Sequence, residues 1–470
     1  MSSAPPELRF ERDSLGEVAI PGWAYWGAET QRAIENFPVS GLGLPDELIG
    51  ALGLIKLHAA AVNEELGFIP ANVARAIAQA AEEIVAGRWR EHFPVDVFQT
   101  GSGTSSNMNA NEVIANRANE ILGAPLGARR PVDPHDQVNR GQSSNDVFPS
   151  AIHIAVRRRA VALIEALAAL EAAFTRKSEE FARVIKLGRT HLQDAVPMTL
   201  GQEFSAYAAQ IALGRAHIEA ACGPLEELAL GATAIGTGLN ADPRFAPRVI
   251  ARIAQATGTR FRPAANRFAA LAGREAVAGF MGALAQTAAS LMKIANDLRL
   301  LGSGPRAGFG EIVLPTLQPG SSIMPGKVNP VVPEMVIQVA AQVTGNHVAV
   351  MIGAQHGPLE LNMMMPMIAY DALQSVDLLT AASRLLAEKC VAGIRADEAR
   401  CAALVERSLA LATPLTPRLG YDRAAAIARR ALEEGRTIRE VAIAEGALTE
   451  EEARTLLDPW RLAHPHSEPR

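Results

Sequence analysis

The stretch AIHIAVRRRAVALIEALAALEAAFTRKSEEFARVIKL, residues 151–187, contains neither glycine nor proline. As a single α-helix it would extend roughly 55 Å, at 1.5 Å per residue. Apolar side chains recur along it at intervals of three and four residues, and once more a heptad further on. Such a stripe is typical of the seam between long helices in a bundle. The stripe consists of Ala160, Leu163, Leu167, Leu170, Phe174 and Phe181.

Further helical runs are expected at about 202–222, 269–301, 333–351 and 367–391, whereas strand patterns are confined to Glu17–Ile20 and Thr233–Thr237. Aromatic residues make up only 5% of the chain, a composition that suits closely packed long helices. The sequence therefore predicts an all-α fold whose apolar helices also pack against other copies of the chain.

A chain of 470 residues exceeds one ordinary core, which favours several domains. Composition changes near residues 100–148 and again near 393–420, so we place boundaries near residues 141 and 398. We expect a mostly helical domain over 1–141, a central long-helix bundle over 142–398 and a small helical domain over 399–470.

Bulk properties argue against several classes of protein. A net charge of −5 disfavours nucleic-acid binding, which needs a basic face. The amino end lacks the pattern of a secretory signal, and no window holds about 18 uninterrupted apolar residues. Cys222, Cys390 and Cys401 are scattered, without the spacing of a zinc or iron–sulfur site. We expect a cytoplasmic protein that spans no membrane.

The loop PGSSIMPGKVNP, residues 319–330, looks like a phosphate-binding loop but is not one. Five residues separate Gly320 from Gly326, and valine follows Lys327, where a P-loop has four residues and then serine or threonine. The two glycines favour a mobile lid. Asn329 is expected to cap a helix that begins at Pro330, which would place Glu334 in its second turn.

Small polar residues also crowd TGSGTSSNMNANEVIANRA, residues 100–118, and NRGQSSNDVFPS, residues 139–150. Serine and threonine before an apolar run are ordinary helix caps, but each segment holds more of them than one cap needs. Two helix amino ends together with Lys327 would form a pocket for a small anion. In GRTHLQDAVPMTLGQE, residues 188–203, His191 lies in a polar turn and is a candidate proton carrier.

In these segments the chain resembles the fumarase/aspartase superfamily, and within it the class II fumarate hydratases. GSSIMPGKVNP is similar to the superfamily motif GSSxMPxKxN, and the other segments follow in the family's order over essentially the whole chain. The resemblance implies a three-part all-α fold, and a homotetramer with a twenty-helix core and active sites shared by three subunits. It implies reversible hydration of fumarate to L-malate through an aci-carboxylate intermediate, without metal or organic cofactor.

The resemblance also implies roles for individual residues. Ser321 matches the family's catalytic base, and His191 matches the group that activates water, backed by Glu334. The substrate-binding residues that it implies are Ser102, Gly103, Thr104, Ser143, Ser144, Asn145, Thr190, Ser322, Lys327, Val328 and Asn329.

Two alternatives within the superfamily stay open. The first is an aspartate ammonia-lyase, to which NPVVPEMVIQV, residues 329–339, is similar; against it, aspartases carry glutamine where this chain carries His191. The second is a non-catalytic structural relative, which we would expect to have lost Ser321, His191 or Lys327.

Class II fumarases have a second dicarboxylate site on a turn that reads His-Pro-Asn-Asp. The corresponding positions here read Asp133-Pro134-His135-Asp136, with Arg130 close by. Because Asp133 would repel a dianion, we expect this second site to be weak or absent.

Overall fold

The structure is a computed structural model in which residues 7–466 are described. Its helices are α1 (Ala28–Asn36), α2 (Asp46–Glu65), α3 (Ala71–Val85), α4 (Thr104–Ile121), α5 (Ser144–Glu180), α6 (Leu200–Leu225), α7 (Phe245–Thr257), α8 (Arg267–Ala272), α9 (Glu275–Leu301), α10 (Val331–Ala354), α11 (Met365–Leu385), α12 (Glu398–Arg407), α13 (Thr416–Leu419), α14 (Tyr421–Glu434), α15 (Ile438–Ala444), α16 (Glu450–Leu456) and α17 (Pro459–Ala463). Strands pair only in twos: β1 (Leu8–Asp13) with β2 (Gly16–Pro21), β3 (Ile185–Thr190) with β4 (Gln193–Thr199), β5 (Glu227–Leu228) with β6 (Arg262–Pro263), and β7 (Ile312–Val313) with β8 (Arg395–Ala396).

The chain divides into two compact units. The first holds the chain up to Ile164 together with Ala216–Gln286 and Ala341–Leu379; the second holds Glu165–Arg215, Thr287–Ala340 and the chain from Thr380 onward. The predicted division at residues 141 and 398 stays a prediction.

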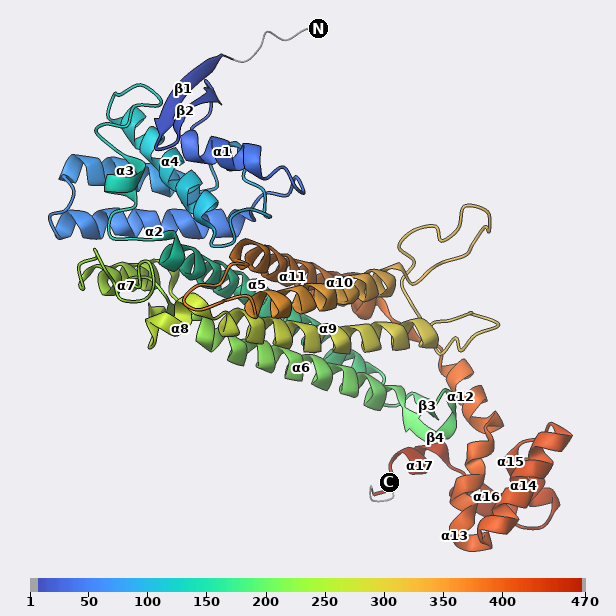
Figure 1. Cartoon of the computed structure of the whole chain (residues 1–470). Coiled ribbons are helices and arrows are strands. Elements are labelled where there is room, and N and C mark those ends of the chain that lie inside the picture. Colours follow the sequence, from blue (N-terminus) through green and yellow to red (C-terminus); the bar gives the residue numbers. More distant parts are fainter. Residues whose placement is uncertain (1–6, 467–470) are drawn as a thin grey trace. The chain divides into compact units, whose positions relative to one another are not determined.

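In the first unit, α2 and α3 lie side by side, with α4 against α3 (Figure 1). The apolar face of α3 explains this packing, because Val73, Ile77 and Ile84 recur at helical spacing and are all buried. Helix α7 packs on α2 from a distant part of the sequence. This arrangement brings the amino ends of α4 and α5 into one unit.

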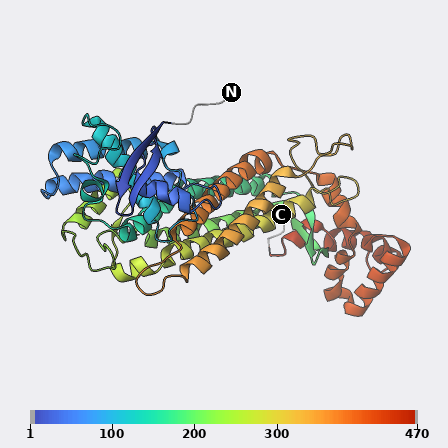
Figure 2. The same ribbon diagram turned by 45° about the horizontal axis from the view of Figure 1, so that its top comes forward.

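Among its described residues, the second unit contains an aromatic cluster and a C-terminal hydrophobic cluster. Near the end of α5 and the start of α6, the rings of Phe174 and Tyr207 lie 5.6 Å apart, and those of Phe181 and Phe204 lie 5.2 Å apart. The C-terminal helices form a cluster of their own, with Ile427 fully buried (Figure 2, red). Capping boxes at Thr437 and Thr449 start α15 and α16.

The mostly helical fold is confirmed, and every residue of the predicted α5 stripe is buried. Three local predictions were wrong. Helix α5 ends at Glu180, because the chain turns into the β3–β4 hairpin before Leu187. Residues 233–237 form turns rather than a strand. The run 269–301 is broken at Gly273 into α8 and α9.

By length and hydropathy, α9 and α10 are the two helices of residues 7–466 that could cross a membrane. Core helices of soluble proteins pass the same test, and half of the relevant α9 window is buried. The expectation that no segment spans a membrane stays a prediction.

Candidate active site

In the first unit, the amino end of α4 exposes hydroxyl groups that capping does not use. The Ser102 and Thr104 hydroxyls lie 2.8 Å from each other, and helix α4 is capped instead by Gln99, whose side-chain oxygen accepts the Ser106 N–H at 3.0 Å. Gly103 has a φ of 74°, and a Cβ there would lie 2.3 Å from the Phe148 ring, so only glycine fits. The half-buried Ser102 and Thr104 therefore remain available to a ligand.

At the amino end of α5, only some of the polar side chains are used for capping or for hydrogen bonds within the protein. The Ser143 hydroxyl accepts the Asn145 N–H at 3.2 Å, which makes Ser143 a helix cap. The Asn145 amide donates to the carbonyl of Ala234 at 2.8 Å. Ser144 accepts a hydrogen bond at 3.0 Å from the Asn107 amide, so its hydroxyl hydrogen is free to point elsewhere.

In the second unit, the predicted proton carrier lies at the tip of the β3–β4 hairpin. His191 has a φ of 55° and Leu192 a φ of 61°. A two-residue hairpin turn of this hand usually takes asparagine and glycine. Left-handed non-glycine residues tend to cluster at functional sites, where strain is tolerated. The turn therefore holds Thr190 and His191 exposed at the end of a rigid ribbon.

The loop that carries Ser321 is closed at its base. The Gly320 N–H donates to the Lys327 carbonyl at 2.8 Å, and the Asn329 amide donates to the Gly320 carbonyl at 2.6 Å. The predicted capping role of Asn329 was therefore wrong: α10 begins at Val331, and Glu334 lies in its first turn rather than its second. Ser322, Lys327 and Val328 are exposed on this loop.

The hydroxyl oxygen of Ser321 accepts two backbone N–H groups, from Ile323 at 3.2 Å and from Met324 at 2.9 Å. Hydrogen bonds donated to an oxygen favour its anionic form. Among the described residues, Lys327 of the same loop enters no ion pair. Its charge is therefore available to a ligand.

The site residues thus fall into two groups. Residues 102–104 and 143–145 belong to the first unit, and residues 190, 191, 321, 322, 327–329 and 334 belong to the second. Within the described chain, no hydrogen bond joins His191 to Glu334. No cluster of three histidine, cysteine, aspartate or glutamate side chains suited to a metal ion occurs in residues 7–466.

At the turn where class II fumarases have a second dicarboxylate site, the protein's own carboxylates occupy the hydrogen-bond donors. Asp133 accepts the N–H groups of His135 at 2.8 Å and Asp136 at 3.1 Å, and it pairs with Arg129 at 2.9 Å. Burial alone would raise the pKa of Asp133, but these donors hold it below the usual value.

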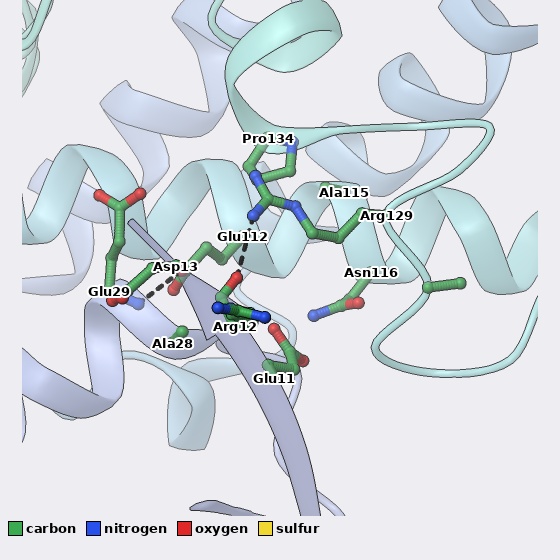
Figure 3. Close-up of a pocket in the computed structure, with 11 residues that line it drawn as sticks. Glu11, Arg12, Asp13, Ala28, Glu29, Glu112, Ala115, Asn116, Arg129 and Pro134 are labelled. Carbon is green, nitrogen blue, oxygen red and sulfur yellow. Dashed lines mark hydrogen bonds between the residues drawn. The ribbon is translucent and has the colours of Figure 1, made fainter. Parts of the chain in front are cut away.

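The other groups of this turn are also engaged. His135 Nε2 lies 2.6 Å from the Glu29 carboxylate, and Arg130 lies 3.9 Å from Asp136. The adjoining cavity measures about 20 Å³, room for about one water molecule. Acidic side chains line this cavity, among them Glu11, Asp13 and Glu29 (Figure 3).

Two buried charge centres near these groups were not found from the sequence. Beneath β3, Arg189 binds Glu311, which is fully buried. Beneath the 139–145 segment, Lys56 and Asp146 are fully buried. Burial lowers the pKa of Lys56 to about 7 and raises that of Asp146 to about 6. A lysine within the apolar run of α2 was the one available signal in the sequence.

Comparison with known proteins agrees with this picture. A family model described as lyase matches residues 16–345, and one described as fumarase C C-terminus matches residues 411–464. Fumarate hydratase class II 2 of Bradyrhizobium diazoefficiens is 50% identical over 98% of both chains. The class II fumarate hydratase of Halobacterium salinarum is 53% identical over 97% of both.

Solved structures of fumarases and fumarate lyases have the same fold as this chain. Class II fumarase from Schistosoma mansoni is 39% identical, with a TM-score of 0.95 over 98% of this chain and 100% of that chain. The fumarate lyase:delta crystallin from Brucella melitensis bound to cobalt is 49% identical, with a TM-score of 0.93 over 97% of this chain and 100% of that chain.

The helical fold and the polar loops together identify the protein as a helical lyase. Within the lyases, the chain belongs to the class II fumarate hydratase family.

Proposed function

We propose that this protein catalyses the reversible hydration of fumarate to L-malate. The observation that carries the proposal is the placement of His191 at a left-handed hairpin tip, directly after Thr190, in a chain about half identical to class II fumarate hydratases. Hydration requires a group that accepts a proton from water, and an imidazole near neutral pKa suits that task. Loss of ammonia from aspartate, the alternative, does not require this imidazole.

In the malate-to-fumarate direction, the C3 proton is removed first. The resulting aci-carboxylate bears two negative charges on one carboxyl group, so it needs donors already aimed at its oxygens. Serine, threonine and asparagine side chains of the 102–104 and 143–145 segments, together with Lys327, would supply them. Each such donor is typically worth about 3–4 kcal/mol in the transition state.

Ser321 would take the C3 proton as an alkoxide. Its two backbone N–H donors favour the anion, as would the positive charge of Lys327 on the same loop. When the C2–O bond breaks, His191 would give its proton to the departing hydroxide, which leaves as water. Glu334 would stabilise the imidazolium form of His191. Hydration runs through the same steps in reverse.

We further propose that the protein is a cytoplasmic homotetramer in which each site draws residues from three chains. Exposed apolar side chains on α10 support self-association: Val348 is 52% exposed and Ile352 is 51% exposed. Such patches on a helix of this length mark protein contacts. The partners that we expect are a small dicarboxylate and copies of the chain, without nucleic acid, membrane, metal or organic cofactor.

The test offers fumarate to the purified protein, with and without ammonium, while the ultraviolet absorbance of fumarate is followed. We expect the absorbance to fall equally in both cases and malate to accumulate. Consumption that requires ammonium and yields aspartate would establish the ammonia-lyase instead. An inert protein would favour the non-catalytic relative.

A further inference from the structure

Lys56 on α2 is fully buried, and its amine reaches two side chains of the segment that leads into α5. It donates to Asn139 Oδ1 at 3.0 Å and to Gln142 Oε1 at 2.9 Å. Both acceptors are neutral amide oxygens. A lysine ammonium carries donors only, and a neutral amine still holds two hydrogens for these two oxygens. Lys56 therefore fixes which end of each amide faces it.

The orientation of Asn139 determines that of its neighbours on α4. Asn139 Oδ1 also receives the amide nitrogens of Asn111 at 3.2 Å and Asn107 at 3.4 Å. Because an oxygen can only accept, both neighbours must present their nitrogen. The second hydrogen of the Asn107 amide then goes to Ser144 Oγ at 3.0 Å.

The orientation with nitrogen toward Asn139 gives the side-chain oxygens of Asn107 and Asn111 no hydrogen bond. The side-chain oxygens of both are buried and, within the described residues, have no hydrogen-bond partner. Rotating either amide would place its oxygen against Asn139 Oδ1, with two acceptors facing each other. The direction of the chain of hydrogen bonds is thus imposed through Asn139. Lys56 sets the orientation of Asn139 together with the Gln142 carbonyl, which accepts the Asn139 amide nitrogen at 3.2 Å.

We infer that Lys56 is a positioning residue for the dicarboxylate site, because its relay through Asn139 and Asn107 holds Ser144 as a hydrogen-bond donor. A hydroxyl that already accepts from Asn107 presents its own hydrogen outward. A carboxylate, which only accepts, is the ligand that this hydrogen suits. The inference rests on the proposed function, in which Ser144 contacts a substrate carboxylate.

The first experiment measures binding of succinate, a saturated four-carbon dicarboxylate, by calorimetry on the full-length protein. We expect Lys56→Met to weaken binding about tenfold, the typical worth of one hydrogen bond, and to raise the KM for fumarate more than it lowers kcat. The matched control is Asn63→Leu, which removes a buried amide of α2 that donates to the Arg140 carbonyl at 3.1 Å. That control should leave succinate binding unchanged.

A second variant guards against misfolding of Lys56→Met. Asn107→Asp keeps the side-chain shape but places an acceptor at Ser144, so the hydroxyl would turn inward and succinate affinity should fall by a similar factor. Combining Lys56→Met with Ser144→Ala should cost no more than the larger single effect, because both act through one hydroxyl. Additive losses would contradict the relay.

The two claims fail separately. If the wild-type protein hydrates fumarate while Lys56→Met and Asn107→Asp bind succinate like the wild type, the relay is wrong and the proposed function stands. If the wild-type protein neither binds succinate nor hydrates fumarate, the proposed function fails, and the relay to its substrate fails with it.

Discussion

The guanidinium of Arg189 donates two hydrogen bonds to the carboxylate of Glu311, across 2.8 and 3.1 Å. The two side chains are 11% and 0% exposed, and Lys186 approaches the same carboxylate at 3.6 Å. Arg189 immediately precedes Thr190 and His191. The pair therefore anchors β3 beside the hairpin tip that presents the proposed proton carrier.

Glu311→Gln should destabilise the fold by about 3–5 kcal/mol, because it leaves the largely buried Arg189 without its anion. Lys186 keeps Glu203 as a partner at 2.8 Å. Urea unfolding at fixed protein concentration measures the loss. The control is Glu451→Gln, whose carboxylate pairs with Arg454 where both side chains are more than 70% exposed, and which should cost under about 1 kcal/mol. Equal losses of unfolding free energy in the two variants would show that the buried pair contributes no more stability than the exposed pair.

At the tip of the β3–β4 hairpin, backbone strain and catalytic role can be tested by separate substitutions. Leu192→Gly should stabilise the protein by about 1 kcal/mol, since a left-handed conformation costs leucine about 1–2 kcal/mol and glycine little.

His191→Asn should leave the fold intact, because asparagine tolerates the left-handed region. It should also lower kcat by about 100-fold or more, the usual worth of a general acid–base. Thermal unfolding and the fumarate absorbance assay measure both effects, and a His191→Asn enzyme of normal turnover would refute the proposed role.

His135 should titrate above the ordinary histidine value, because the hydrogen bond that its imidazolium donates to the Glu29 carboxylate raises its pKa. A raised folded-state pKa means that the pair contributes stability below the unfolded pKa of about 6.5. This contribution is lost as pH rises through the folded value. NMR titration of the imidazole should give a pKa above 6.5 in the wild type and a lower one in Glu29→Gln. An unchanged pKa in that variant would contradict the assignment.

The Asp133 turn should bind no dicarboxylate. Calorimetric titration with L-malate is expected to give one site per chain, because Asp133 and Glu29 already occupy the donors of this turn. Asp133→Ala should leave the malate affinity of the main site unchanged. Two sites per chain, or malate density beside Arg130 and His135, would contradict this prediction.

The helical architecture could be predicted because its signals are local. The α5 stripe, the absence of glycine and proline, and the capping serine at position 143 each depend on a few neighbouring residues. The hairpin at 185–199 was missed because its tip lacks glycine, the usual mark of a two-residue turn. Its first strand, β3, is tied to the rest of the second unit by Arg189 and Glu311, which lie far apart in the sequence.

The polar site could be predicted only in part, for a similar reason. Clusters of serine, threonine and asparagine were visible, and the hydroxyls of Ser102 and Ser144 are indeed free of capping duty. The capping role predicted for Asn329 was wrong, because its amide donates across the loop to the Gly320 carbonyl and does not bond to the following helix. The hydrogen bonds of Lys56 could not be predicted, because its partners Asn139 and Gln142 are 83 and 86 residues away.

The central claim is that neutral hydroxyls, amides and one ammonium from distant parts of the chain surround a single dicarboxylate. A crystal structure of the assembled protein with succinate bound tests this most directly. We predict that Ser102, Ser144, His191, Ser321 and Lys327, contributed by neighbouring chains, converge on one succinate molecule. Succinate bound elsewhere, or these five residues lining no common pocket in the assembly, would contradict the account.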